Sequence, residues 1–281
     1  MKGAAAIFSA VALLLVLFWK GRPVEDRLLT GKAMGTTWTL AWRGTTPPHL
    51  HADVAELLER WEQVLSQWRA NSDLSRHNRG EMPTPELARV LRLAEEVRIA
   101  SGGAFDHRIL EKVHAAGFGP AGHGIDLSAI GKGFAVDRVG ELLRQRGVRD
   151  FVFEFGGEVL AGDGEWDVEI ERPGIAARKA ERTIKLRGRA LATSGNYHQF
   201  RPGTSGLKSH LIDPRTGEPM ERSPCSVSVL APDCATADAW ATALFILGPN
   251  HEAVPPKVEV SWQYGPQGFQ PTVLRQEAST N

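Results

Sequence analysis

An aspartate lies inside an otherwise apolar segment that has the length and composition of a buried helix. The segment is Ala235-Thr-Ala-Asp-Ala-Trp-Ala-Thr-Ala-Leu-Phe-Ile-Leu247. A spacing of four residues places the side chains of Asp238 and Thr242 on one helix face, one turn apart. Burying a carboxylate is costly unless it is paired or binds a metal, and carboxylate and hydroxyl oxygens suit Mg²⁺. The alternative is a helix N-terminus, where Asp238 caps the amides and Thr242 bonds to a carbonyl.

Composition limits the classes of partner. The 281 residues include 33 Lys and Arg and 33 Asp and Glu, so the formal net charge is zero. We therefore expect no nucleic-acid partner that relies on a basic surface. The length allows one large domain or two modest ones. Cys225 and Cys234 are too few for a disulfide framework or a zinc site, and the sequence leaves open a single bridge between them.

The N-terminus resembles a targeting segment. One lysine precedes the apolar run of residues 4–19, and Lys20 and Arg22 follow it. Such a run is typical of an export signal or a membrane anchor, and its length is near the short limit for spanning a bilayer. No Ala-x-Ala site follows closely, and no cysteine is available for lipid attachment. We expect residues 1–29 to form an uncleaved anchor and tether with the body outside the cytoplasm; a cleaved signal is the alternative.

Periodicity in the body predicts an α+β fold with mixed, largely antiparallel sheets and packed helices. Apolar residues at helical spacing indicate a helix over 52–67, and Thr84-Pro85 begins a second helix that ends near Ala100. A third helix is expected over 133–147. Strands are expected at 30–40 (with a turn or bend at 34–37), 151–155, 166–171, 181–187, 190–193, 209–212 and 225–231. The domain would then cover residues 30–272, with a tail at 273–281.

A possible anion site lies at Ile125-Asp-Leu-Ser-Ala-Ile-Gly-Lys-Gly133. We interpret this segment as a short strand, a tight loop and a helix start. Backbone amides and Lys132 at a helix N-terminus favour an anion. The glycine spacing differs from that of a Walker loop. The alternative is a solvated lysine at a structural turn.

Three other segments carry chemically useful residues. Gly102-Gly103 before Phe105 and Asp106 would let the backbone approach a ligand, or simply end a helix. The hydroxyls and amide of residues 193–197 are also common in turns. His210 lies at a predicted strand start, where a lone histidine is commonly structural.

Taken in order, these segments resemble the ApbE family, the FAD:protein FMN transferases. The resemblance covers residues 32 to about 248 and includes a T-fold-related, ApbE-like architecture. The motifs that carry it are Met34-Gly-Thr, Leu65-Ser-Gln-Trp-Arg-Ala-Asn-Ser-Asp-Leu-Ser-Arg-His-Asn78, Gly102-Gly-Ala-Phe-Asp106, Asp126-Leu-Ser-Ala-Ile-Gly-Lys-Gly133, Gly156-Gly157, Thr193-Ser-Gly195, His210-Leu-Ile-Asp-Pro-Arg-Thr-Gly217 and Ala237-Asp-Ala-Trp-Ala-Thr-Ala243.

The resemblance implies an Mg²⁺-dependent transfer of FMN from FAD to a threonine or serine hydroxyl of a target flavoprotein, with release of AMP. It implies a partner that is a subunit of a membrane redox complex, and a location on the periplasmic side of a bacterial inner membrane. The FAD contacts implied are Met34, Trp68, Ala104, Phe105, Asp106, Asp126, Lys132 and Ile212. The Mg²⁺ ligands implied are Asp238 and Thr242, with the carbonyls of Ala129 and Ala241, and His210 would be the base.

Two alternatives remain at this stage. The same site would serve an Mg²⁺-dependent FAD pyrophosphatase, in which water attacks, and a non-catalytic flavin-binding protein needs no base. Trp68 and Phe105 offer flat faces for flavin or adenine, or belong to the core. The sequence departs from the family pattern in lacking a lipoprotein cysteine, in lacking a proline-rich continuation after Asp106, and in having Glu158 where aspartate is more common.

Overall fold

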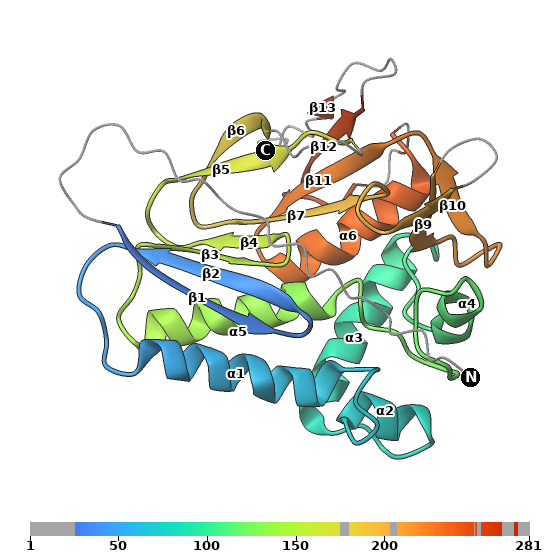
Figure 1. Cartoon of the computed structure of the whole chain (residues 1–281), viewed down its shortest axis with the longest axis horizontal. Helices are drawn as coiled ribbons and strands as arrows, with labels where there is room; N and C mark the ends of the chain where they lie inside the picture. The colour runs from blue at the N-terminus through green and yellow to red at the C-terminus, as the bar shows by residue number, and fades with distance from the viewer. Residues whose placement is uncertain are drawn as a thin grey trace, which may run out of the picture.

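A long antiparallel sheet organises the chain (Figure 1). The computed structural model describes residues 26–174, 180–202, 207–249, 251, 254–265 and 273–274. In that part of the chain the large sheet has the order β1-β2-β3-β4-β7-β11-β12-β13, beside the smaller sheets β10-β9-β8 and β5-β6. Each of these neighbouring pairs is antiparallel. The predicted α+β class is therefore confirmed.

The elements have the following bounds. The strands are β1 Arg27–Ala33, β2 Thr36–Trp42, β3 Phe151–Phe155, β4 Glu158–Ala161, β5 Trp166–Glu171, β6 Ala180–Leu186, β7 Ala190–Gly195, β8 Phe200–Pro202, β9 Leu207–Ile212, β10 Pro219–Arg222, β11 Cys225–Ala231, β12 Glu259–Tyr264 and β13 Val273–Leu274. The helices are α1 Leu50–Leu65, α2 Asp73–Asn78, α3 Pro85–Ala100, α4 Leu110–Ala115, α5 Gly131–Gln145 and α6 Cys234–Leu247.

Both faces of the large sheet are covered. Phe151, Phe153 and Phe155 alternate along β3 and pack in the main core with the helices. Val152 points to the other face, into a second cluster that includes Trp166 of the β5–β6 hairpin. Figure 1 shows α1, α5 and α6 on the side opposite this hairpin. Burial on both faces explains why β3 is apolar almost throughout instead of alternating with polar residues.

Sequence signals located the long elements well. Thr84 caps α3, where its hydroxyl accepts a hydrogen bond from the amide of Leu87 at 3.3 Å, and Pro85 is the first helical residue. The strand expected at 30–40 is a hairpin of β1 and β2 that turns at Met34-Gly35. The short strand expected at the start of the segment Ile125–Gly133 is wrong, because residues 125–127 are not in a strand. The short elements α2, α4, β4, β8, β10, β12 and β13 were not predicted.

The ends of the domain differ slightly from the expected boundaries. β1 begins at Arg27, because Leu28 and Leu29 pair with Ala41 and Leu40 of β2. Val273 and Leu274 pair with β12, so these two residues of the expected tail belong to the sheet. The predicted anchor at 4–19 lies outside the described residues. Within the described part, none of the helices has the length and apolar character needed to cross a membrane. Cys225 and Cys234 are both free and buried.

Helices α5 and α6 cap each other where they cross. Asp137 of α5 accepts hydrogen bonds from the amides of Cys234 and Ala235 at the start of α6, at 2.8 and 2.9 Å. Asp238 of α6 accepts one from the amide of Gly133 at the start of α5, at 3.0 Å. Each carboxylate thus binds amides that lack a partner within their own helix. The conventional N-cap of α6 is Asp233, whose side chain accepts from Thr236, so Asp238 does not cap its own helix.

We predict that Gly133→Ala destabilises the fold. A Cβ at this position would lie 2.4 Å from the Cys234 carbonyl oxygen and 2.8 Å from the Asp238 Cβ, so the helices must separate. The expected loss is about 1–3 kcal/mol in the free energy of unfolding, the usual cost of overpacking. Urea denaturation of the two proteins measures it.

Gly131→Ala is the matched control in the same helix turn. Its Cβ would meet Leu65 Cδ1 at 3.6 Å, an ordinary contact distance. An equal loss of stability in both variants would show that the crossing at Gly133 is not the cause.

Candidate active site

Two of the predicted oxygen ligands, Asp238 and Thr242, lie one turn apart on α6. Asp238 is 5 % exposed, and its Oδ2 accepts the hydrogen bond from Gly133. Its Oδ1 makes no hydrogen bond with any described residue. The Thr242 hydroxyl lies 3.3 Å from the hydroxyl of Ser194 on β7. One oxygen of the carboxylate is therefore structural, while the other is available for a ligand.

The start of α5 supplies a second open oxygen. The Gly133 amide bonds to Asp238, so it is not directed at the Ala129 carbonyl four residues earlier, and no backbone amide in the described part bonds to that carbonyl. The Ala241 carbonyl lies inside α6, where helical bonding occupies one lone pair. A carboxylate, a hydroxyl and two carbonyls are hard ligands, so this set fits Mg²⁺. Among the described residues no three His, Cys, Asp or Glu gather as a metal-binding group, and the predicted set needs only one carboxylate.

Lys132 lies beside this set and is paired with Glu158. The Lys132 amine lies 2.5 and 2.6 Å from the two carboxylate oxygens of Glu158, which is 4 % exposed, and 3.5 Å from the Gly156 carbonyl. Burial opposes the charge on Lys132, but Glu158 and Asp238 outweigh it and raise its pKa. Desolvation raises the pKa values of Glu158 and Asp238, and the charge of Lys132 opposes both shifts. The lysine predicted to hold phosphate therefore has a carboxylate partner, which the sequence did not indicate.

The hydrogen bond of His210 fixes its tautomer. Its Nδ1 lies 3.2 Å from the backbone carbonyl of Gln199. A carbonyl only accepts, so Nδ1 carries the proton and Nε2 keeps a lone pair. Desolvation lowers the pKa of this half-buried imidazole to about 4; the Gln199 bond opposes that shift and the charge of Lys132 adds to it. His210 is thus neutral at physiological pH, the form that accepts a proton.

Hydrogen bonds join the predicted loop residues. The Asp126 amide donates to the His107 carbonyl at 2.7 Å, which links the segment containing Asp106 to the start of α5. Asp126 Oδ1 accepts from the Ser128 amide at 2.7 Å, and Oδ2 accepts from Gln67 at 3.1 Å. Asp106 pairs with the guanidinium of Arg108. These contacts bring together the loops after α1, after α3 and before α5.

The remaining predicted FAD contacts differ in exposure. Met34 has a left-handed backbone, and its amide donates to Glu62 of α1 at 3.1 Å. Trp68 is 56 % exposed, so its indole presents a face to solvent. Ala104, Phe105 and Ile212 are at most 2 % exposed. Phe105 belongs to the main core, so its ring offers no open face, whereas Trp68 does.

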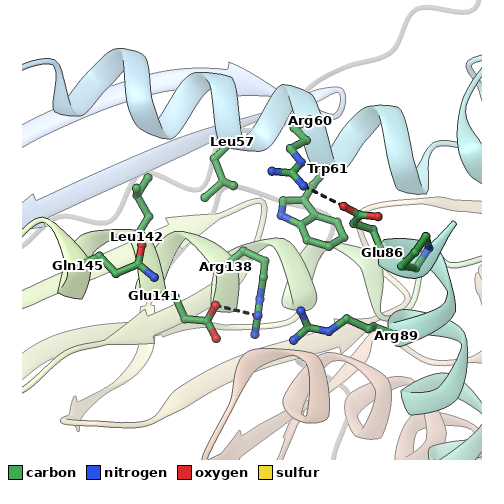
Figure 2. A pocket seen from close by; sticks show the side chains of 10 residues that line it. Leu57, Arg60, Trp61, Glu86, Arg89, Arg138, Glu141, Leu142 and Gln145 are labelled. Atoms are coloured by element: carbon green, nitrogen blue, oxygen red, sulfur yellow. Dashed lines mark hydrogen bonds and ion pairs between the residues drawn. The ribbon is translucent and has the colours of Figure 1, made fainter.

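A groove in the described part of the chain lies apart from these residues. Figure 2 shows it between α1, α3 and α5. Its volume is about 390 Å³. Most of the charged side chains that line it form ion pairs. Arg60 pairs with Glu86 at 2.9 Å, and Arg138 pairs with Glu141 at 2.7 Å. None of the predicted site residues lines it. The volume falls within the range of small-molecule sites, but the residues predicted to carry the chemistry lie elsewhere, around the start of α5.

Comparison with known proteins identifies the class. The chain matches the model of the ApbE family over residues 34–124 and 119–254. These ranges include every residue predicted for the site. The chain therefore belongs to the ApbE family. This confirms the assignment made from the motifs, and with it the flavin-transferase class of enzyme.

Similar proteins cover nearly the whole domain. FAD:protein FMN transferase of Vibrio cholerae is 29 % identical, over 85 % of this chain and 86 % of that protein. The protein of the same name from Haemophilus influenzae is 30 % identical, with the same coverage. The solved flavin transferase ApbE from Vibrio cholerae has a TM-score of 0.77 at 26 % identity, covering 89 % of this chain and 97 % of that one. The apo flavinyl transferase ApbE of Pseudomonas stutzeri also scores 0.77, at 25 % identity, covering 89 % and 95 %.

We predict that the imidazole of His210 titrates far below an ordinary histidine. Its pKa should be about 4 in the FAD-free, metal-free protein, because desolvation disfavours the imidazolium form. NMR titration of the ring resonances measures this, and His210→Gln assigns the signal by removing it. A midpoint at or above about 6.5, the ordinary value, would contradict the desolvated environment.

Proposed function

We propose that this chain transfers the FMN half of FAD to a threonine or serine hydroxyl of a target flavoprotein, in an Mg²⁺-dependent reaction that releases AMP. The observation that carries the proposal is the convergence of Asp238 and Lys132 where α5 crosses α6, fixed by the hydrogen bond from the Gly133 amide to Asp238. Carboxylate, ammonium and helix N-terminus are the groups that phosphoryl transfer requires. Membership of the ApbE family supports the flavin donor.

At the phosphate end of the site, charged and polar groups would bind the diphosphate and the metal. Lys132 would bind the FAD diphosphate as a point charge at the start of α5. Asp238, Thr242 and the carbonyls of Ala129 and Ala241 would hold the metal. When bound there, Mg²⁺ would offset phosphate charge in the transition state. Trp68 and the loops that contain Asp106 and Asp126 would position the rest of FAD. Hydrogen bonds of Asp126 to His107 and Gln67 join these loops.

His210 would accept the proton of the incoming hydroxyl at Nε2. The hydroxyl oxygen forms a bond to the phosphorus of the FMN half, and the bond from that phosphorus to the bridging oxygen breaks. AMP leaves with the bridging oxygen. A low pKa in the free protein keeps Nε2 unprotonated, and the negative charge of bound diphosphate would raise the pKa again toward a useful value.

We place the target in a membrane redox complex and the enzyme on the periplasmic side of a bacterial inner membrane. The charged start, the apolar run of residues 4–19 and the missing cleavage site support an anchor. Removal of residues 1–25, just before β1, should give a soluble protein that still binds FAD. A mature protein that begins near residue 22 would instead indicate a cleaved signal.

The direct test of the function is covalent modification. Co-expression with a candidate flavoprotein subunit should add the mass of FMN to a threonine- or serine-containing peptide of that subunit, as measured by mass spectrometry. In the same assay His210→Gln should slow transfer by about 10²–10⁴-fold, the usual range for loss of a general base. FAD affinity should change little.

Two results would redirect the assignment. AMP release from FAD at an equal rate with and without the acceptor would indicate the pyrophosphatase. Bound FAD without metal-dependent turnover would indicate a binding protein. His198→Gln is the matched histidine control, because His198 pairs with Glu171 at 2.9 Å and has no proposed role.

We predict that Asp238→Asn weakens metal binding while the protein stays folded. Asparagine keeps an acceptor for the Gly133 amide but removes the charge on the metal-facing oxygen. Transfer should fall by several orders of magnitude, because phosphate charge is no longer offset. Asp137→Asn is the matched control, because Asp137 caps α6 reciprocally and is not a proposed ligand. Equal loss of Mn²⁺ affinity in both variants would show that the helix crossing, and not a ligand, had been disrupted.

A further inference from the structure

Three buried carboxylates feel the charge of Lys132, and we name Glu154, Glu158 and Asp238 the carboxylate cluster. They are 1, 4 and 5 % exposed. The charge of Lys132 acts on all three, and Glu158 is affected by both of the other members. One ammonium thus faces three carboxylates. Burial raises the pKa of Glu154 to about 7, and the charge of Lys132 opposes that shift.

The three members have different partners. Asp238 bonds to the Gly133 amide, and Glu154 bonds to the Gly157 amide at 2.9 Å. Glu158 instead directs both oxygens at the Lys132 amine. Among the described contacts, it is the cluster member that engages the lysine directly.

The turn between β3 and β4 builds this contact. Gly156 and Gly157 both have positive φ, which favours glycine. A Cβ at Gly156 would lie 2.9 Å from Thr36 Cγ2 and 3.5 Å from Lys132 Cδ, so the turn packs closely on the lysine stem. Glu158, the first residue of β4, is therefore held at a fixed position against the amine.

Lys132 and a divalent cation at Asp238 would repel each other. Both are needed if the lysine and the metal act on one diphosphate. A carboxylate that pairs with the lysine removes much of this repulsion while it keeps the amine in place. Glu158 has this position, and Asp238 does not, because one of its oxygens bonds to Gly133.

We propose that Glu158 is a positioning residue that holds the Lys132 amine and balances its charge, so that a divalent cation binds next to it at Asp238. This inference rests on the proposed metal site. It predicts that loss of the Glu158 charge has different effects on the binding of two ligands. Removing the charge of Glu158 should weaken cation binding. It should not weaken FAD binding in the absence of metal, because the lysine is then freer to bind phosphate.

The test uses Glu158→Gln, which keeps the side-chain shape. Mn²⁺ binding to the FAD-free protein is measured by electron paramagnetic resonance, and FAD binding is measured by flavin fluorescence with EDTA present. Mn²⁺ affinity should fall by about 10–100-fold, the usual effect of losing a residue that supports a metal site. FAD affinity without metal should stay equal or rise. Glu158→Asp, which keeps the charge, should retain more of the Mn²⁺ affinity than Glu158→Gln.

A double-mutant cycle isolates charge balance from packing. Lys132→Met alone should strengthen Mn²⁺ binding and weaken FAD binding. Lys132→Met with Glu158→Gln removes both charges, so Mn²⁺ affinity should return toward the wild-type value. Glu165→Gln is the control, because it breaks an exposed lysine pair, Glu165–Lys185 at 2.8 Å, and should change neither affinity.

Four results would overturn the inference. Equal losses of Mn²⁺ and FAD affinity in Glu158→Gln would indicate a structural role, as would a double variant that binds Mn²⁺ no better than Glu158→Gln. Wild-type Mn²⁺ affinity in Glu158→Gln, with affinity lost in Asp238→Asn, would reject Glu158 and leave the proposed metal site standing. Wild-type Mn²⁺ affinity in Asp238→Asn would reject the metal site itself.

Discussion

The crossing of α5 and α6 is the contact on which the site depends. Each helix start is capped by a carboxylate from the other helix, Asp137 in one direction and Asp238 in the other. The helices approach closely because Gly133 has no Cβ. Breaking either bond would leave buried amides unpaired, which costs more than a typical hydrogen bond contributes. The amide of Gly133, the amine of Lys132 and the carboxylate of Asp238 are therefore placed by the same interaction that fixes the helices.

Electrostatics explain how a cation would strengthen FAD binding at such a site. The carboxylate cluster is buried, its members have raised pKa values, and Lys132 is shared among them. A diphosphate that approached this cluster alone would meet net negative charge. A divalent cation at Asp238 would offset the negative charge that Lys132 leaves unbalanced. The proposed metal would thus bring donor and protein together, in addition to its part in the transfer.

Sequence patterns predicted local features and missed long-range partners. The Asp238–Thr242 spacing, the Thr84 cap of α3 and the alternating aromatics of β3 each depend on residues a few positions apart. The bond from Gly133 to Asp238 joins residues 105 positions apart, and the pair Lys132–Glu158 joins residues 26 apart. No periodicity records such contacts. Glu158 stood out only as a departure from the family motif, and β8 and β10 are too short to give a pattern.

The separation of the proposed base from the proposed metal site constrains the acceptor. His210 lies on β9, in the small β10-β9-β8 sheet, whereas Asp238 and Lys132 lie on the helices under the large sheet. α6 packs against β9, and the charge of Lys132 reaches His210, so the two parts adjoin. An acceptor hydroxyl that gives its proton to Nε2 must therefore enter between the small sheet and the start of α5.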